Sequence, residues 1–261
     1  TPANYDEHLA LLGGCDLVIE AISERMDWKK ALFEKVAPHL APGAVVVSLQ
    51  NGVDNEEKIQ RIIPRGIVFG GVSYIYSTIT VPGVVTHTVG PTKIVFGPLQ
   101  KEHAETMRRA QSIHQTMRNA GINAELSENI QVELWKKFIF IAAVGGMTAL
   151  TRLTLGEILA VPATRDVLGD AMRETLALAH ARGIGLPADF VEQVFEILKR
   201  YDNNSRSSLY HDLVHGKRLE IEAFSGYVMR EGQRLGIPTP VHRAIYAALL
   251  PYHLKHSGST V

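Results

Sequence analysis

Two adjacent lysines, Lys136 and Lys137, stand at the start of a strongly apolar segment and are the residues most suited to acid–base chemistry. Seven apolar residues, 138–144, follow them without a polar break. A helix of that composition is apolar on every face and lies inside the protein. Since helical neighbours point about 100° apart, at most one lysine lies squarely on a given face. A lysine packed beside the buried face suits proton transfer or anion binding; the alternative is that both extend to solvent along apolar stems.

Two polar positions follow apolar runs that have the pattern of buried strands. Ser23 comes after the run 15–22, and Asn51 comes shortly after the run 44–49. Ligands of parallel α/β sheets bind beyond the carboxyl ends of the strands, so both positions are candidates for contact with a ligand. Asn51 precedes Gly52, which predicts a tight turn that presents the amide at the sheet edge; an ordinary Asn-Gly turn fits equally well.

Further polar candidates lie in the last third of the chain. Glu220 is expected to begin a helix over 219–235, where the helix dipole favours a carboxylate; the alternative is that it faces the buried lysine across a cleft. Ser208 lies in a polar stretch, 207–212. His211 and His215 have the i,i+4 spacing of a shared metal face, but no HExxH pattern or carboxylate pair supports a metal site.

Composition limits the function classes. The chain has 261 residues and 46% hydrophobic content, enough for one large core or two moderate ones. Net charge is zero and the pI is about 7.2, so no nucleic-acid or anionic-membrane partner is expected. Cys15 is the only cysteine, which excludes an internal disulfide and fits a reducing compartment. No apolar run approaches the ~18–20 residues of a membrane span, and no signal peptide is visible. We expect a cytoplasmic protein.

The elements that position these residues change character along the chain. A strand over 15–22, a helix over 27–40 and a strand over 44–49 predict a βαβ unit with parallel strands. More strands are expected at 67–74, 84–89 and 93–96, and mainly helices follow residue 102, one of them capped by Thr164. The predicted fold class is α/β plus all-α. Residues 1–120 are expected to form a partial Rossmann-type parallel sheet, and residues 121–261 a helical substrate and catalytic domain.

Several motifs together resemble one known family. Residues 48–57 (SLQNGVDNEE) resemble the central motif of ketopantoate reductases, also called 2-dehydropantoate 2-reductases, and 133–137 (ELWKK) resemble their catalytic-lysine helix. Residues 207–212 (SSLYHD), 216–222 (GKRLEIE) and 235–240 (LGIPTP) look like their C-terminal signature. The motifs keep the family's order and spacing across essentially the whole chain.

The resemblance implies a Rossmann nucleotide-binding domain and a helical domain like that of 6-phosphogluconate dehydrogenases. The implied reaction is NADPH-dependent reduction of a 2-oxo acid to a 2-hydroxy acid, as in pantothenate synthesis. By position, Lys137 would be the general acid, and Glu220 would bind substrate and hold Lys137. Ser208 would contact the substrate carboxylate. Asn51 would position the nicotinamide ribose and the substrate, and Ser23 is assigned with it to the cofactor side.

The sequence departs from the family pattern in three ways. The glycine-rich dinucleotide fingerprint should precede Cys15 and is absent, so an N-terminal βαβ portion is expected to be missing and NADPH is expected to bind poorly. Family asparagines four and eight residues after the lysine are Ile141 and Gly145 here, and Ser23 replaces a lysine. These changes favour a less polar 2-oxo acid as an alternative substrate. A third hypothesis is a non-catalytic helical binding or dimerisation protein. A homodimer is possible in either case, and no metal is expected.

Overall fold

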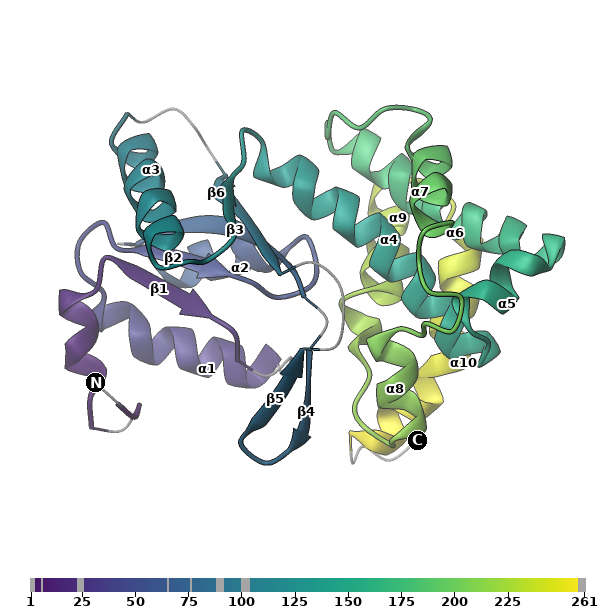
Figure 1. The fold of residues 1–261 in the computed structure, drawn as a ribbon, viewed down its shortest axis with the longest axis horizontal. Helices are drawn as coiled ribbons and strands as arrows, with labels where there is room; N and C mark the ends of the chain where they lie inside the picture. Colours follow the sequence, from purple (N-terminus) through teal and green to yellow (C-terminus); the bar gives the residue numbers. More distant parts are fainter. Residues whose placement is uncertain are drawn as a thin grey trace. The chain divides into compact units, whose positions relative to one another are not determined.

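The computed structural model describes most of the chain, namely residues 3–5, 7–22, 26–64, 66–75, 77–87, 92–99 and 104–257. The chain forms two compact units, Thr1–Leu134 and Trp135–Val261 (Figure 1). The first is an α/β unit and the second is built of helices. The predicted fold class, α/β followed by all-α, is confirmed.

The first unit contains a five-stranded sheet of order β1-β2-β3-β6-β7 and a two-stranded hairpin, β4-β5. The strands are β1 (Leu17–Glu20), β2 (Val45–Ser48), β3 (Ile67–Tyr74), β4 (Ser77–Val81), β5 (Val84–His87), β6 (Lys93–Pro98) and β7 (Ala124–Leu126). β1, β2 and β3 run parallel, with Glu20 level with Ser48. Their carboxyl ends therefore meet at one edge of the sheet, where ligands of such folds bind.

Helices cover both faces of this sheet (Figure 1). The helical segments of the unit are η1 (Leu9–Gly14), α1 (Met26–Val36), η2 (Ala37–His39), α2 (Asn55–Ile62) and α3 (Ala104–Asn119). Successive strand residues point to opposite faces. Val46 packs with the apolar side chains of α1 and α2, whereas Val45 and Val47 pack with those of α3. Strand β2, which consists of three valines and Ser48, is therefore buried on both sides.

The sheet differs from the expected one in its later strands. β6 is antiparallel to β3, so the sheet is mixed rather than wholly parallel. Strand β4 was not predicted, because its alternating polar residues resemble a loop. The sheet also continues beyond residue 120 through β7, because that strand pairs with β6. Within the described residues β1 is an edge strand, and its Ile19 is 46% exposed.

The second unit is organised around the long apolar helix α4. Its helices are α4 (Ile130–Thr151, which begins in the first unit), α5 (Leu155–Ala160), α6 (Pro162–Ala181), α7 (Phe190–Leu198), α8 (Ser208–Val214), the 3-10 turn η3 (Glu220–Glu222), α9 (Ser225–Leu235) and α10 (Pro240–His256). Residues 142–149 of α4 are all buried. Among the described helices, α4 alone is long and apolar enough to cross a membrane, but 67% of its apolar window is buried inside the protein, as in a core helix.

Thr164 does not cap a helix, contrary to the expectation. Val161 is the N-cap of α6 and Pro162 is its first residue, a position that proline favours because its fixed φ suits the helix and no amide donor is lost. The Thr164 hydroxyl instead donates to the carbonyl of Ile158, at 2.7 Å.

Candidate functional site

Lys137 lies in the second turn of α4, where both lysines of the pair are partly exposed. The residue after it, Phe138, is 1% exposed and makes edge-to-face contacts with Phe224 and Tyr227, at 6.4 and 5.6 Å between ring centroids. These contacts fasten this turn of α4 to the segment that follows Glu220. The turn of α4 that carries Lys137 therefore packs against two rings that lie four and seven residues after Glu220.

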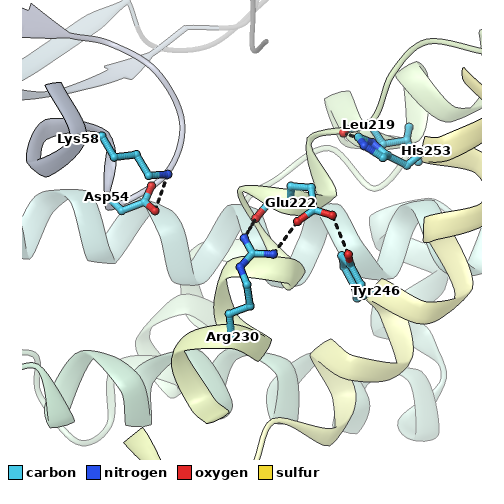
Figure 2. Close-up of polar contacts among 7 residues, drawn as sticks. All are labelled: Asp54, Lys58, Leu219, Glu222, Arg230, Tyr246 and His253. Atoms are coloured by element: carbon cyan, nitrogen blue, oxygen red, sulfur yellow. Dashed lines mark hydrogen bonds and ion pairs between the residues drawn. The ribbon is translucent and has the colours of Figure 1, made fainter. Parts of the chain in front are cut away.

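Glu220 was expected to begin an α-helix, but this expectation is wrong. Glu220 lies in the turn η3, and the helix α9 begins only at Ser225. Glu220 is partly buried, and its Oε1 atom is inaccessible to solvent. The chain on both sides of Glu220, at Leu219 and at Glu222, is hydrogen-bonded to α10 (Figure 2). On one side His253 Nδ1 donates to the Leu219 carbonyl at 2.8 Å. On the other, Tyr246 Oη donates to Glu222 Oε1 at 2.6 Å.

Glu222 is held in its ionised form. Arg230 also donates to it, to Oε2 at 2.5 Å and to the backbone carbonyl at 2.7 Å (Figure 2). Burial alone would raise the pKa of Glu222, but the bonds from Tyr246 and Arg230 outweigh burial and lower it. Burial and this carboxylate raise the pKa of Tyr246 to about 12. The Glu222 carboxylate is thus committed to structure, which leaves Glu220 as the functional candidate of this turn.

Ser208 is the first residue of α8 and is exposed. The preceding Ser207 is the N-cap, since its side chain accepts from the Tyr210 amide at 3.0 Å. Its Oγ also lies 2.6 Å from Oγ1 of Thr148, which is buried on α4. The start of α8 is therefore tied to the helix that carries Lys137.

The two positions where the resemblance expects asparagines have apolar surroundings. Gly145 is buried on α4, and a Cβ added there would meet Leu209 at 3.8 Å and Phe224 at 3.9 Å, which is ordinary contact. Ile141, one turn earlier, is partly exposed. Neither residue offers a side-chain hydrogen bond.

Asn51 follows β2 in the first unit, at the carboxyl ends of the parallel strands. Gly52 has φ +120°, a conformation that favours glycine. The Asn51 carbonyl accepts from Asn55 Nδ2 at 2.9 Å, while within the described residues its side-chain amide has no partner. Ser23, the other residue assigned to the cofactor side, lies outside the described residues.

A buried carboxyl close to this turn was missed by the sequence analysis. Glu56, in the first turn of α2, is 2% exposed. Burial raises its pKa to about 7, with a further increase from Asp54, while the backbone amides of Glu56 and Gly71 act in the opposite direction. A run of polar residues at a helix start resembles a solvated turn, so the sequence held no signal of this burial.

No metal site was found within the described part of the chain, where no three His, Cys, Asp or Glu side chains cluster. His211 and His215 stack at 6.3 Å, and His215 Nδ1 donates to the His211 carbonyl at 2.7 Å. That ring nitrogen is therefore engaged with the helix backbone.

Comparisons with known proteins agree with the predicted family. Residues 5–101 match the family model "Ketopantoate reductase PanE/ApbA", and residues 129–253 match its C-terminal model. The 2-dehydropantoate 2-reductase of Archaeoglobus fulgidus is 30% identical over 217 residues, which are 81% of this chain and 70% of that protein.

Solved structures give the same result. A PanE/ApbA family ketopantoate reductase from Ralstonia eutropha is similar with a TM-score of 0.82 and 29% identity, covering 95% of this chain and 79% of that one. A D-mandelate dehydrogenase solved with NADH and anilino(oxo)acetate shares the fold, with a TM-score of 0.79 at 18% identity, covering 93% of this chain and 77% of that one.

Proposed function

The chain belongs to the ketopantoate reductase family, and we propose that it reduces the ketone of a 2-oxo acid to a 2-hydroxy acid with NADPH. The observation that carries the proposal is the packing of Phe138 against Phe224 and Tyr227. It supports a site in which Lys137 and Glu220 act together, because Lys137 precedes Phe138 directly and the Glu220 carbonyl accepts from the Phe224 amide at 3.2 Å.

The proposed roles follow from charge and position. The Lys137 ammonium donates a proton to the ketone oxygen, where negative charge develops in the transition state. The Glu220 carboxylate orients that ammonium and binds substrate. The Ser208 hydroxyl, at the exposed start of α8, donates to the substrate carboxylate. When bound, the nicotinamide cofactor supplies the hydride.

The residues of the first unit fit one end of such a cofactor. The Asn51 amide at the carboxyl ends of β2 and its neighbours suits the nicotinamide ribose. The pyrophosphate end would need backbone amides of a glycine-rich loop at a helix start, and the 261 residues contain no G-x-G-x-x-G sequence. The chain spans 70–79% of the length of the three relatives described above. Binding of NADPH, and its preference over NADH, is therefore tested both in this chain and in this chain joined to the part of the Ralstonia eutropha relative that it does not cover.

The adjacent lysines provide a matched test of the mechanism. Lys137→Ala is expected to lower kcat by ~10² or more, the contribution of a general acid, while Lys136→Ala changes it little. Glu220→Gln is expected chiefly to raise KM for the 2-oxo acid. Cofactor oxidation by ketopantoate, followed by absorbance with NADPH and with NADH, gives these constants. Equal losses in the two lysine variants would refute the assigned role of Lys137.

A second candidate substrate is a 2-oxo acid with a larger or less polar side chain than ketopantoate. The observation that favours it is the apolar lining at Gly145, formed by Leu209 and Phe224. A polar substrate facing Ile141 would lose a hydrogen bond of ~0.5–1.5 kcal/mol.

A panel of aliphatic and aromatic 2-oxo acids distinguishes the two substrates. The second candidate requires kcat/KM to be lowest for ketopantoate, and Ile141→Asn to shift the preference towards it. If kcat/KM is highest for ketopantoate by about tenfold or more (~1.4 kcal/mol), the apolar lining does not select the substrate.

A further inference from the structure

A buried polar network joins the carboxyl ends of β1 and β2. Its members are Glu20, Lys29, Ser48 and Gln50, with exposed fractions of 5%, 5%, 0% and 8%. Gln50 is the central residue. Its Oε1 accepts from Lys29 Nζ at 2.9 Å, and its Nε2 donates to Glu20 Oε1 at 3.1 Å and to the Ile22 carbonyl.

The Glu20 carboxylate is hydrogen-bonded at both oxygens. Oε1 also accepts from the Ile22 amide at 2.7 Å, and Oε2 accepts from Ser48 Oγ at 3.1 Å. A buried carboxylate and a buried ammonium are thus bridged by one amide group. Removing one member of such a network leaves a buried charge without full compensation, which is costly.

The network lies at the point where strands β1 and β2 end and the backbone leaves the sheet. The last ladder bond between them runs from the Leu49 amide to the Glu20 carbonyl at 3.3 Å. Beyond that bond, within the described residues, the Gln50 side chain joins the segment after β1 to the segment after β2. The next residue is Asn51, whose carbonyl is held from the other side by Asn55.

We infer that Gln50 is a positioning residue, which ties the segment after β1 to the segment after β2 and thereby fixes where Asn51 presents its amide. Lys29 and Glu20 fix the orientation of the Gln50 amide group. The Lys29 ammonium can only donate and so selects Oε1, and the Glu20 carboxylate can only accept and so selects Nε2. The inferred consequence for cofactor binding rests on the proposed function, whereas the inferred link between the two segments does not.

The link is tested by hydrogen exchange on the 261-residue chain without ligand. Gln50→Glu keeps the shape of the side chain but removes its donors and sets two carboxylates against each other. Peptides covering 17–22 and 45–53 should then both exchange about tenfold faster, as for the loss of one hydrogen bond of ~1.4 kcal/mol. The double variant Glu20→Gln with Gln50→Glu restores a donor and an acceptor between the two side chains and should return exchange part of the way to that of the wild type, because the Ile22 amide and carbonyl lose their partners.

Gln60→Leu is the matched control. This glutamine also bridges backbone groups, with bonds to the Ile63 carbonyl at 3.0 Å and from the Val68 amide at 3.3 Å, but at the amino end of β3. The Gln60→Leu variant should therefore leave the exchange rates of peptides 17–22 and 45–53 unchanged. The inference is overturned if Gln50→Glu does not accelerate both peptides, if the double variant exchanges as fast as the single one, or if Gln60→Leu has the same effect.

Kinetics then test the consequence for Asn51. Gln50→Glu should raise KM for NADPH about tenfold while lowering kcat much less, and the double variant should reverse part of that rise in KM. A loss confined to kcat would overturn the positioning role. If the wild-type chain reduces no 2-oxo acid in either form, the proposed function fails, and the exchange result still decides the link between the two segments.

Discussion

Thr148 Oγ1 lies 2.6 Å from Ser207 Oγ, so a single hydrogen bond joins the helix of Lys137 to the cap of the helix that begins with Ser208. This bond is part of a series of hydrogen bonds that links four groups. The Tyr210 amide donates to the Ser207 hydroxyl, which donates to Thr148, and Thr148 donates to the Val144 carbonyl at 2.8 Å. Each hydroxyl thus both donates and accepts, which is why a polar residue is stable inside α4.

Thr148→Val should break this series of hydrogen bonds and displace Ser208. The Ser207 hydroxyl loses its acceptor, so the free energy of unfolding should fall by about 1–3 kcal/mol and KM for the 2-oxo acid should rise, with KM for the cofactor unchanged. Thr148→Ser keeps the hydroxyl and should restore KM. Thr151→Val, one turn along, is the control, because among the described residues its hydroxyl bonds only to nearby backbone groups. A similar KM in Thr148→Val and wild type would show that this bond does not position Ser208.

The adjacent glycines of α4 should respond in opposite ways to alanine. A Cβ at Gly145 would meet its neighbours at 3.8 Å or more, but one at Gly146 would lie 2.9 Å from Cδ1 of the buried Ile245. Gly145→Ala should therefore be neutral or stabilise by up to ~1 kcal/mol, through helix propensity. Gly146→Ala should destabilise by about 1–3 kcal/mol, through overpacking. Chemical unfolding of both variants checks the order, and the reverse order would contradict the packing described here.

Tyr246→Phe should cost more stability than Arg230→Gln, although both remove a donor to Glu222. The Arg230–Glu222 pair has side chains 53% and 43% exposed, and exposed pairs contribute only about 0–1 kcal/mol. Tyr246 is partly buried, and its bond to a charged group is worth about 1.5–3 kcal/mol. If Glu222 holds the turn of Glu220, Tyr246→Phe also raises KM for the 2-oxo acid. Equal unfolding free energies in the two variants would contradict this ranking.

The parts of the fold with a local signal could be predicted from the sequence. The apolar run after Lys137 indicated the buried helix α4, and the alternation of strand, helix and strand indicated the parallel start of the sheet. The antiparallel direction of β6 could not be predicted, because it depends on pairing with β3 rather than on local pattern.

Residues of the candidate site could be predicted only where they lie in a motif that resembles the family. The segment of Glu220 looked helical because Phe224, Tyr227, Val228 and Leu235 follow at helical spacing. The backbone at Glu220 is instead set by Tyr246 and His253 from α10. The network of Gln50 was not singled out. Glu20, a charge inside an apolar strand, was its one visible signal, while Lys29 looked like part of a solvated helix face.

Glu56 should make the protein less stable as pH rises. Its pKa is raised to about 7 in the folded protein from an ordinary 4.5, so the folded state binds more protons between these values and its stability falls as pH increases through them. Glu56→Gln removes this loss and should be more stable than wild type by about 3 kcal/mol at pH 8. The two proteins should converge below pH 5. Unfolding by urea across this range is the measurement, and a difference that does not grow with pH would exclude Glu56 as its source.

His242, in the second unit, should make the protein less stable as pH falls, which is the opposite of the effect of Glu56. It is fully buried, with Nε2 donating to the Ala171 carbonyl at 3.0 Å and Nδ1 3.1 Å from Ser225 Oγ. Burial lowers its pKa from 6.5 to about 4, against a smaller opposite effect of Ala171.

The unfolded chain therefore binds the proton first, and stability falls as pH decreases from 6.5 to 4. By pH 4 wild type should lose about 3 kcal/mol more than His242→Gln, whose amide retains a donor and an acceptor without titrating. In a Trp28→Phe background the fluorescence of Trp135, which is 3% exposed, reports unfolding of this unit. Equal pH dependence with and without the histidine would show that another group controls stability in acid.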